Sequence, residues 1–212
     1  MMMLKINPVH PESERIHRAA EIIMSGGVIG YPTETVYGLG ANAFLPDAVE
    51  RIFTLKQRVA SQAILLIAAD LDQVAQLVSE IPNVALRLAE SFWPGPLTLI
   101  FNAGPKVIPE LTGASGTVGV RIPGNAICLE LLKATGIPIT STSANISGQQ
   151  NPISAEEVLK YFGERLDLII DGGKTPSRVP STVLSLVDSR PVLIREGAIQ
   201  KSDIEKIIGI KF

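Results

Sequence analysis

The stretch AILLIAA, residues 63–69, is the segment that most clearly indicates the fold. An unbroken apolar run of this length is typical of a strand that is buried on both faces of a sheet. A helical pattern precedes the run at 46–57, and two more follow it at about 70–78 and 83–92. Because helices flank a buried strand on both sides in the chain, the segment predicts a layered α/β fold with a central strand here.

Strand-like and helical patterns continue to alternate along the rest of the chain. Further helices are predicted at 12–25, 125–135, 155–162 and 202–208. Further strands are predicted at 4–7, 28–32, 96–101, 117–123, 137–141, 166–173, 181–187 and 191–197, with a glycine-rich loop at 102–116. Ser154, followed three residues later by Glu157, predicts a capping box. Since the sequence contains no repeat or linker, it predicts a single domain over residues 1–212.

The composition limits the class of protein. The chain has 212 residues, of which 46% are hydrophobic, and this is enough for one substantial core. A net charge of −2 disfavours a globally basic nucleic-acid binder but leaves a local basic cleft open. The N-terminal segment lacks the apolar core of about 7–15 residues that a secretory signal needs. The run at 63–69 is too short to span a bilayer, which takes about 20 residues. We therefore expect a soluble, cytoplasmic protein without membrane contact.

Several common catalytic arrangements are absent from the sequence. Cys128 is the single cysteine, which excludes an intrachain disulfide and predicts a packed core thiol rather than a nucleophile. His10 and His17 lie away from every motif, so a Ser-His-Asp triad has no support. Neither the GxxxxGK[ST] phosphate-binding loop nor the GxGxxG dinucleotide fingerprint occurs.

The segment YPTETVYGLGANA, residues 31–43, follows a predicted strand and has two interpretations. Thr33 and Thr35 leave the strand, and Gly38 and Gly40 permit a close approach of the backbone to a ligand. Alternatively, the segment is a strand-to-strand turn in which the threonines fill ordinary β positions.

Basic side chains stand at the ends of predicted elements. Lys56 and Arg58 close the helix at 46–57 and converge only if the helix ends between them; otherwise they complement the helix dipole. Arg121 and Arg195 each end an apolar strand. Ligands of open α/β sheets gather at strand ends, and guanidinium groups suit carboxylates and phosphates. The alternative is that both arginines pair with acidic side chains at a sheet edge.

Hydroxyl and amide side chains concentrate in PITSTSANISG, residues 138–148. Residues 141–143 are three consecutive hydroxyl side chains, Asn145 follows them, and Ser181 lies in a second such segment. Such side chains either form the hydrogen bonds of a turn and a helix cap or bind a ligand. Together with the basic residues, and without an obvious nucleophile, they indicate a site that orients anionic ligands, as in phosphoryl or nucleotidyl transfer.

The motifs, taken in order, resemble the YrdC-like family of threonylcarbamoyl-AMP synthases. They are GGVIGYPTETVYGLGANA (26–43), RIFTLKQR (51–58), TVGVRIPGN (117–125), GIPITSTSANISG (136–148), DGG (171–173), PSTVLSL (180–186) and LIREGAI (193–199). The resemblance runs from about residue 16 to 199. It is to the single-domain form of the family.

The resemblance implies a fold and a reaction. The fold is a twisted mixed β-sheet with flanking helices and a concave basic cavity. In the reaction, L-threonine, bicarbonate and ATP, with Mg²⁺ accompanying the ATP, give threonylcarbamoyl-adenylate and pyrophosphate. The adenylate then serves a threonylcarbamoyl transferase complex that modifies the adenosine next to the anticodon of tRNA. Direct contact of this chain with tRNA stays open.

The family motifs also imply roles for individual residues. Lys56 and Arg58 match its Lys-x-Arg motif and are the expected catalytic residues. The expected ATP-binding positions are Lys56, Arg58, Gln62, Thr117, Ser143, Asn145, Asn151 and Arg195. The expected L-threonine-binding positions are Thr35, Arg121, Ser141 and Ser181. Neither the sequence nor the resemblance names a metal ligand.

The chain departs from the family pattern just after the Lys-x-Arg motif. Val59 replaces a proline, Gln62 an asparagine and Ile67 a histidine. Gln62 still carries an amide that donates hydrogen bonds, but an isoleucine makes no polar contact with threonine. The departure leaves the preferred amino acid open.

Two other functions fit parts of the pattern. The first is a non-catalytic RNA-binding module that uses the same cavity. The sequence argues against it because the basic residues are not interleaved with aromatic ones. The second is a carbamoyl-adenylate enzyme with another carbamoyl source, as in hydrogenase-maturation proteins. Those chains are longer and carry zinc-finger and acyl-phosphatase regions, and this sequence shows neither.

Overall fold

The chain folds into alternating strands and helices, as the sequence predicts. A computed structural model describes residues 2–58 and 63–212. The strands are β1 (Met2–Lys5), β2 (Ile29–Tyr31), β3 (Gly38–Gly40), β4 (Leu66–Ile67), β5 (Leu97–Asn102), β6 (Thr117–Arg121), β7 (Ile139–Thr140), β8 (Thr142–Ser143), β9 (Leu168–Asp171), β10 (Thr182–Ser185) and β11 (Val192–Arg195). The helices are α1 (Ser13–Met24), α2 (Pro46–Lys56), α3 (Leu71–Leu77), α4 (Asn83–Phe92), α5 (Pro109–Thr112), α6 (Ala126–Thr135), α7 (Ala155–Phe162) and α8 (Lys201–Ile208).

The strands form two mixed sheets. One has the order β1-β9-β2-β3-β8, and the other has the order β11-β10-β5-β6-β4-β7. In the first, β2 runs parallel to β9 and antiparallel to β3. In the second, β5 runs parallel to β10 and antiparallel to β6. The prediction of mixed pairing is confirmed, but the strands are divided between two sheets instead of forming one.

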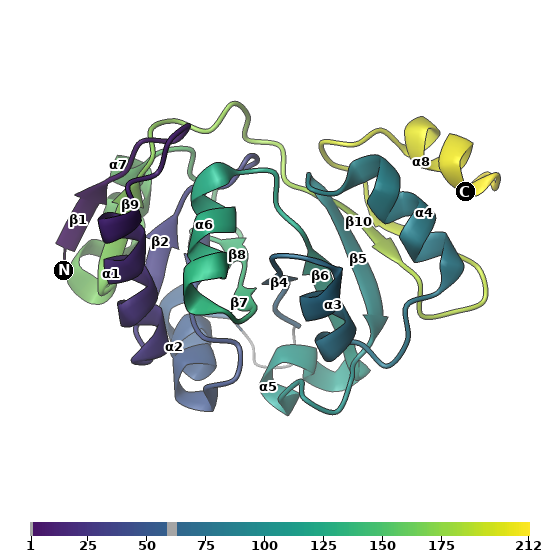
Figure 1. Ribbon diagram of the computed structural model, residues 1–212, viewed down its shortest axis with the longest axis horizontal. Helices are drawn as coiled ribbons and strands as arrows, with labels where there is room; N and C mark the ends of the chain where they lie inside the picture. Colours follow the sequence, from purple (N-terminus) through teal and green to yellow (C-terminus); the bar gives the residue numbers. More distant parts are fainter. Residues whose placement is uncertain (1, 59–62) are drawn as a thin grey trace.

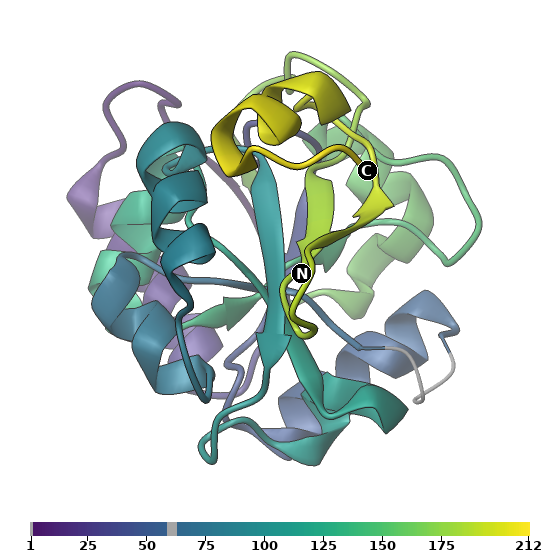
Figure 2. The same ribbon diagram turned by 90° about the vertical axis from the view of Figure 1, so that its right-hand side faces the viewer.

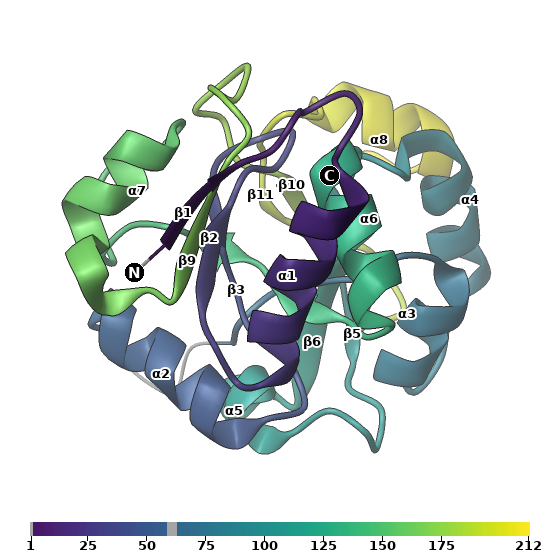
Figure 3. The same ribbon diagram turned by 60° about the vertical axis from the view of Figure 1, so that its left-hand side comes forward.

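Helices cover the faces of both sheets. Figure 3 shows α1 and α6 side by side on one face of the five-stranded sheet, with α7 on the opposite face. At the other end of the molecule, α4 and α8 pack together beside the six-stranded sheet (Figures 1 and 2). Helix α1 buries Ile16, Ala19, Ala20 and Ile23, the apolar stripe of its sequence. This amphipathic packing is what fixes the helix on the sheet.

The segment 63–69 forms a shorter strand than predicted. Only Leu66 and Ile67 pair as β4, which lies between β6 and β7 and not at an edge. The neighbouring backbone is satisfied outside a regular ladder, since Ile64 N donates to Leu111 O and Ala68 N donates to Arg121 O. The inner position is as expected. Burial on both faces is confirmed as well, since Leu66 and Ile67 are both fully buried, although Leu65 and Ile67 also border a cavity.

One other local prediction needs correction, and a second is confirmed in part. The predicted loop at 102–116 contains helix α5 and a 3₁₀ turn at Gly113–Ser115. The segment 31–43 contains strand β3, so its turn interpretation is realised in part. Gly40 is required there, because a Cβ atom would lie 2.8 Å from the Tyr31 ring. Glycine therefore lets the neighbouring strand carry a tyrosine.

Two smaller predictions, the cap of α7 and the buried thiol, are confirmed. Ser154 caps α7 by accepting from Glu157 N, while the Glu157 carboxylate accepts from Ile153 N. Cys128 is fully buried, its thiol donates to Pro32 O, and burial raises its pKa. In the parts of the chain that the structure describes, no helix is long and apolar enough to cross a membrane.

Candidate functional site

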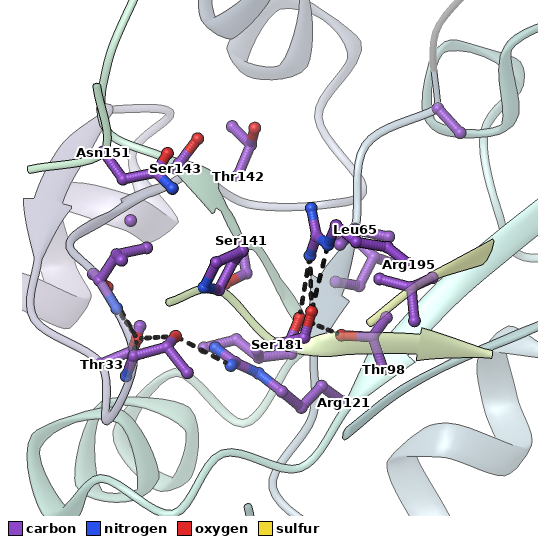
Figure 4. A pocket seen from close by; sticks show the side chains of 18 of the residues that line it. Thr33, Leu65, Thr98, Arg121, Ser141, Thr142, Ser143, Asn151, Ser181 and Arg195 are labelled. Carbon is purple, nitrogen blue, oxygen red and sulfur yellow. Dashed lines mark hydrogen bonds between the residues drawn. The ribbon is translucent and has the colours of Figure 1, made fainter. Parts of the chain in front are cut away.

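A cavity of about 540 Å³ borders both sheets. Its wall on one side is the segment between β2 and β3 together with β8, and on the other side it is formed by β4, β5 and the strands next to them (Figure 4). The alternation of strand β5 explains the lining, since Thr98 and Ile100 face the cavity while Leu97 and Leu99 point into the core.

Most of the residues predicted from sequence come together here. Those that line the cavity are Thr35, Arg58, Arg121, Ser141, Ser143, Asn151, Ser181 and Arg195. Lys56, Asn145 and Thr117 are described but do not line it. Gln62, like Val59, lies outside the described residues. The structure therefore assembles all four expected threonine-binding residues and half of the expected ATP-binding ones.

The end of helix α2 separates Lys56 from Arg58. Gln57 between them adopts a left-handed conformation with φ of 51°, so the helix stops and the chain turns. Arg58 then faces the cavity, while Lys56 is directed beneath its wall. The Lys56 Nζ donates to the backbone carbonyl of Asn145 at 2.8 Å and also to that of Ser143. Lys56 thus holds the segment that carries Ser143 and Asn145.

Asn145 strengthens the same segment. Its side-chain amide donates to Gln149 O at 2.5 Å, and its backbone N–H donates to Ser143 O at 2.9 Å. Thr117 lies elsewhere, at the start of β6, and its hydroxyl is hydrogen-bonded to Ser115 Oγ. Lys56 and Asn145 therefore support the cavity wall from behind, and Thr117 makes no contribution to the lining.

Burial of Lys56 gives a testable pH dependence. Burial, followed by the charge of Arg58, lowers the pKa of Lys56 from 10.5 to about 7. Between these two values the unfolded chain binds more protons, so the free energy of unfolding contributed by Lys56 rises with pH and is constant below the window. We expect Lys56→Met to lower stability by about 1–3 kcal/mol, because the Asn145 carbonyl loses its donor whereas the Ser143 carbonyl keeps the Asn145 N–H. The deficit relative to the unsubstituted protein should grow between about pH 7 and pH 10.

Chemical denaturation at several pH values measures this deficit. Lys133→Met is the matched control, because Lys133 is exposed and forms only a surface ion pair with Glu130. A deficit for Lys56→Met that is no larger than for the control, or that does not change with pH, would contradict the supporting role of Lys56.

Arg58 is held at the cavity by two hydrogen bonds. Its guanidinium donates to Thr142 Oγ1 at 3.3 Å and to Ala63 O at 2.8 Å. Its Nε is buried and has no hydrogen-bond partner among the described residues. Burial lowers the pKa of Arg58 from its ordinary value. Because Arg58 lines the cavity as a partly desolvated cation, it is suited to bind an anionic oxygen.

Arg121 is 5% exposed and lies between an acid and a hydroxyl. It donates to Thr35 Oγ1 at 3.3 Å and lies 3.4 Å from Glu34 Oε1. The contact with Glu34 is an ion pair without hydrogen-bond geometry, since both carboxylate oxygens are buried and accept no hydrogen bond from the described residues. The acidic partner proposed as an alternative is therefore present, yet Arg121 still lines the cavity.

Arg195, Ser181 and Thr98 form a connected group (Figure 4). Arg195 donates to the Ser181 carbonyl at 2.8 and 3.2 Å, and Ser181 Oγ lies 2.8 Å from Thr98 Oγ1. Burial, and then the charge of Arg121, lowers the pKa of Arg195. Thr98 was not among the predicted residues. Its signal in the sequence is one polar side chain between the leucines of an apolar strand.

The lining has a clear charge pattern. Among the described residues it contains three arginines and no aspartate or glutamate. Such a lining favours anionic ligands. It does not fit a protein-held Mg²⁺, which prefers carboxylate ligands, and the described residues contain no cluster of three or more His, Cys, Asp or Glu side chains that would hold a metal. Ile67 also lines the cavity and is fully buried, so the apolar side chain is an integral part of the wall.

Comparison with known proteins shows the family of the chain. The sequence model described as "Telomere recombination", which represents the Sua5, YciO and YrdC proteins, matches residues 21–197. The chain belongs to the Sua5/YciO/YrdC family. The resemblance stated from the sequence motifs is therefore confirmed for most of the chain.

Individual relatives within the family extend the comparison. A threonylcarbamoyl-AMP synthase of Pyrococcus abyssi is 44% identical over 198 residues, which cover 93% of this chain and 58% of the relative. The structure of P. abyssi Sua5 complexed with L-threonine has a TM-score of 0.96 at 42% identity and covers 99% of this chain and 61% of that one. The Escherichia coli YciO structure has a TM-score of 0.87 at 34% identity, with 94% and 98% covered. The chain thus spans about three fifths of the length of its P. abyssi relative.

Proposed function

We propose that this chain is a nucleotidyltransferase that makes threonylcarbamoyl-AMP and pyrophosphate from L-threonine, bicarbonate and ATP. The observation that carries the proposal is the cavity, where three arginines and several hydroxyls meet without a carboxylate in the described lining. The name of the P. abyssi relative and its threonine complex support the choice of substrate. The described segments, 2–58 and 63–212, act in this proposal as one catalytic unit with a basic cavity.

In this proposal, the part of the cavity around Arg121 binds the amino acid. Its guanidinium would bind the threonine carboxylate, and the hydroxyls of Thr35, Ser141 and Ser181 would orient the rest of the amino acid. The threonine amine and bicarbonate give a carbamate and water. The cavity residues hold this carbamate so that its oxygen faces the α-phosphorus of ATP.

In this proposal, the part of the cavity around Arg58 and Arg195 binds the triphosphate of ATP. These two cations would offset the charge of the triphosphate as the carbamate oxygen bonds to the α-phosphorus and pyrophosphate leaves. Ser143 and Asn151 would orient the nucleotide, and Lys56 and Asn145 would keep this wall in place from behind. No side chain needs to form a covalent intermediate. A Mg²⁺ ion that accompanies ATP would be held by phosphate oxygens and water.

The product would pass to a threonylcarbamoyl transferase complex for the modification of tRNA. The RNA-binding alternative is not favoured, because the described lining has one aromatic residue, Tyr37. Its hydroxyl donates to Gly173 O and its side chain is buried, so it offers no surface on which a base can stack.

Pyrophosphate release from ATP, with bicarbonate and Mg²⁺ present, tests the proposal. We expect release that depends on L-threonine and is much slower with serine or without an amino acid. Release that is equal under all three conditions would contradict the assignment of threonine. Tight binding of ATP with no release under any condition would contradict the enzyme itself.

A further inference from the structure

Thr98 is a buried polar residue for which the mechanism above has no role. It is 1% exposed and lies in β5 between Leu97 and Leu99, which belong to the main hydrophobic core. The alternation of the strand turns its side chain to the opposite face, where it lines the cavity. A hydroxyl in this position is costly unless it is hydrogen-bonded.

The partner of Thr98 is Ser181, one of the threonine-binding residues of the proposed function. The two hydroxyl oxygens are 2.8 Å apart. The register of the sheet brings them together, because β5 and β10 are parallel neighbours and Ser181 immediately precedes β10. The contact therefore joins two adjacent strands on the cavity floor.

Arg195 limits the hydrogen bonds that the hydroxyls of Thr98 and Ser181 can form. Its guanidinium donates to Ser181 Oγ at 3.3 Å and, at shorter distances, to the Ser181 carbonyl. Arginine has no acceptor, so Ser181 receives this contact through a lone pair. Of the two hydroxyl hydrogens, one is used between Thr98 and Ser181 and the other is left for the cavity. In either orientation the pair supplies one donor, which suits an anionic oxygen.

We propose that Thr98 donates its hydroxyl hydrogen to Ser181 Oγ and is thereby a positioning residue, because the Ser181 hydroxyl hydrogen is then free to donate to an oxygen of the amino-acid substrate. The proposal rests on the proposed function and assigns Thr98 to its threonine end. Arg195 fixes the Ser181 backbone on one side and Thr98 fixes the hydroxyl on the other. Ser181 therefore does not need to be ordered by the substrate, which lowers the entropic cost of binding.

Thr98→Val tests this role because valine has nearly the same shape but no hydroxyl. We expect the KM and Kd of L-threonine to rise about tenfold, the size of one hydrogen bond, with kcat and the ATP affinity changed less than about twofold. Calorimetric titration with L-threonine measures the Kd independently of turnover. Thr98→Ser, which keeps the hydroxyl, should restore most of the affinity.

Thr135→Val is the matched control. Thr135 is also a buried threonine, but its hydroxyl donates to carbonyls at the end of α6 and it does not line the cavity. This variant should bind L-threonine normally. An equal loss of threonine affinity in the two variants, or an equal loss for ATP and threonine in Thr98→Val, would show a merely structural role and overturn the proposal.

A double-mutant cycle with Ser181→Ala decides whether Thr98 acts through Ser181. If it does, Thr98→Val has little further effect on threonine affinity in the Ser181→Ala background. Additive effects would overturn the proposal, since Thr98 would then act independently. Failure of the proposed function is distinguishable, because the unsubstituted protein itself would then release no pyrophosphate with threonine.

Discussion

Replacing Arg58 by alanine is expected to slow threonine-dependent pyrophosphate release by about 10²–10³-fold, the usual cost of removing one preorganised charge contact. Arg58 is the cation that the end of helix α2 delivers to the cavity. Its Nε has no partner among the described residues and is buried, so the group is desolvated before a ligand arrives. Its contribution should therefore be larger than that of an exposed arginine.

Steady-state kinetics with saturating threonine measures this effect, and thermal unfolding of the same variant shows whether the fold persists. Arg87→Ala is the matched control, since Arg87 is an exposed arginine of α4 and does not line the cavity. If Arg58→Ala turned over at the rate of Arg87→Ala, Arg58 would have no part in the reaction.

The second large effect is expected for threonine binding by Arg121→Ala. Loss of the guanidinium should raise the KM for L-threonine about 10²-fold, because the substrate carboxylate loses its charged partner. The KM for ATP should change far less. The variant should also lose about 3–5 kcal/mol of stability, since the carboxylate of Glu34 stays buried without its cation.

Arg121→Lys separates binding from folding. A lysine keeps the charge beside Glu34 but replaces the planar fork with a single point charge. We expect this variant to recover much of the stability and little of the threonine affinity. Equal KM values for threonine in Arg121→Lys and the unsubstituted protein would show that no bidentate contact is made. A KM for ATP that rises as much as that for threonine in Arg121→Ala would place Arg121 at the nucleotide end instead.

The helices other than α5, and the three arginines of the cavity, were predictable because each leaves a local signal. Ser154 caps a helix that begins at the next residue. Gly40 makes room for Tyr31, which is only nine residues away in the chain. The arginines at strand ends were also predictable, because a charged residue that directly follows an apolar run lies at the end of a strand and not inside the core. The family motifs then supplied the roles that local pattern left open.

The features that the sequence did not reveal depend on the three-dimensional path of the chain. Lys56 and Arg58 look alike in the Lys-x-Arg motif, and only the left-handed Gln57 sends one to the cavity and the other beneath its wall. The division of the strands into two sheets depends on pairing partners far apart in the chain, such as β2 with β9. No period in the sequence reports such pairing.

Thr98 shows the same limit at the scale of one residue. The role of a lone threonine in an apolar strand cannot be predicted until the neighbouring strand is known, because its partner Ser181 is 83 positions away in the sequence. In β4, conversely, the local sequence predicts more regular structure than forms. Its apolar sequence is suited to a long strand, but its partner β7 pairs with it through only two residues.

The most direct test is mass spectrometry of the products formed from ATP, L-threonine and carbon-13 bicarbonate. The account predicts a threonylcarbamoyl-AMP species that carries the heavy carbon, appears together with pyrophosphate and is strongly reduced in Arg58→Ala. If ATP stays intact, or if AMP-linked products form without threonine or without the labelled carbon, the proposed reaction is wrong.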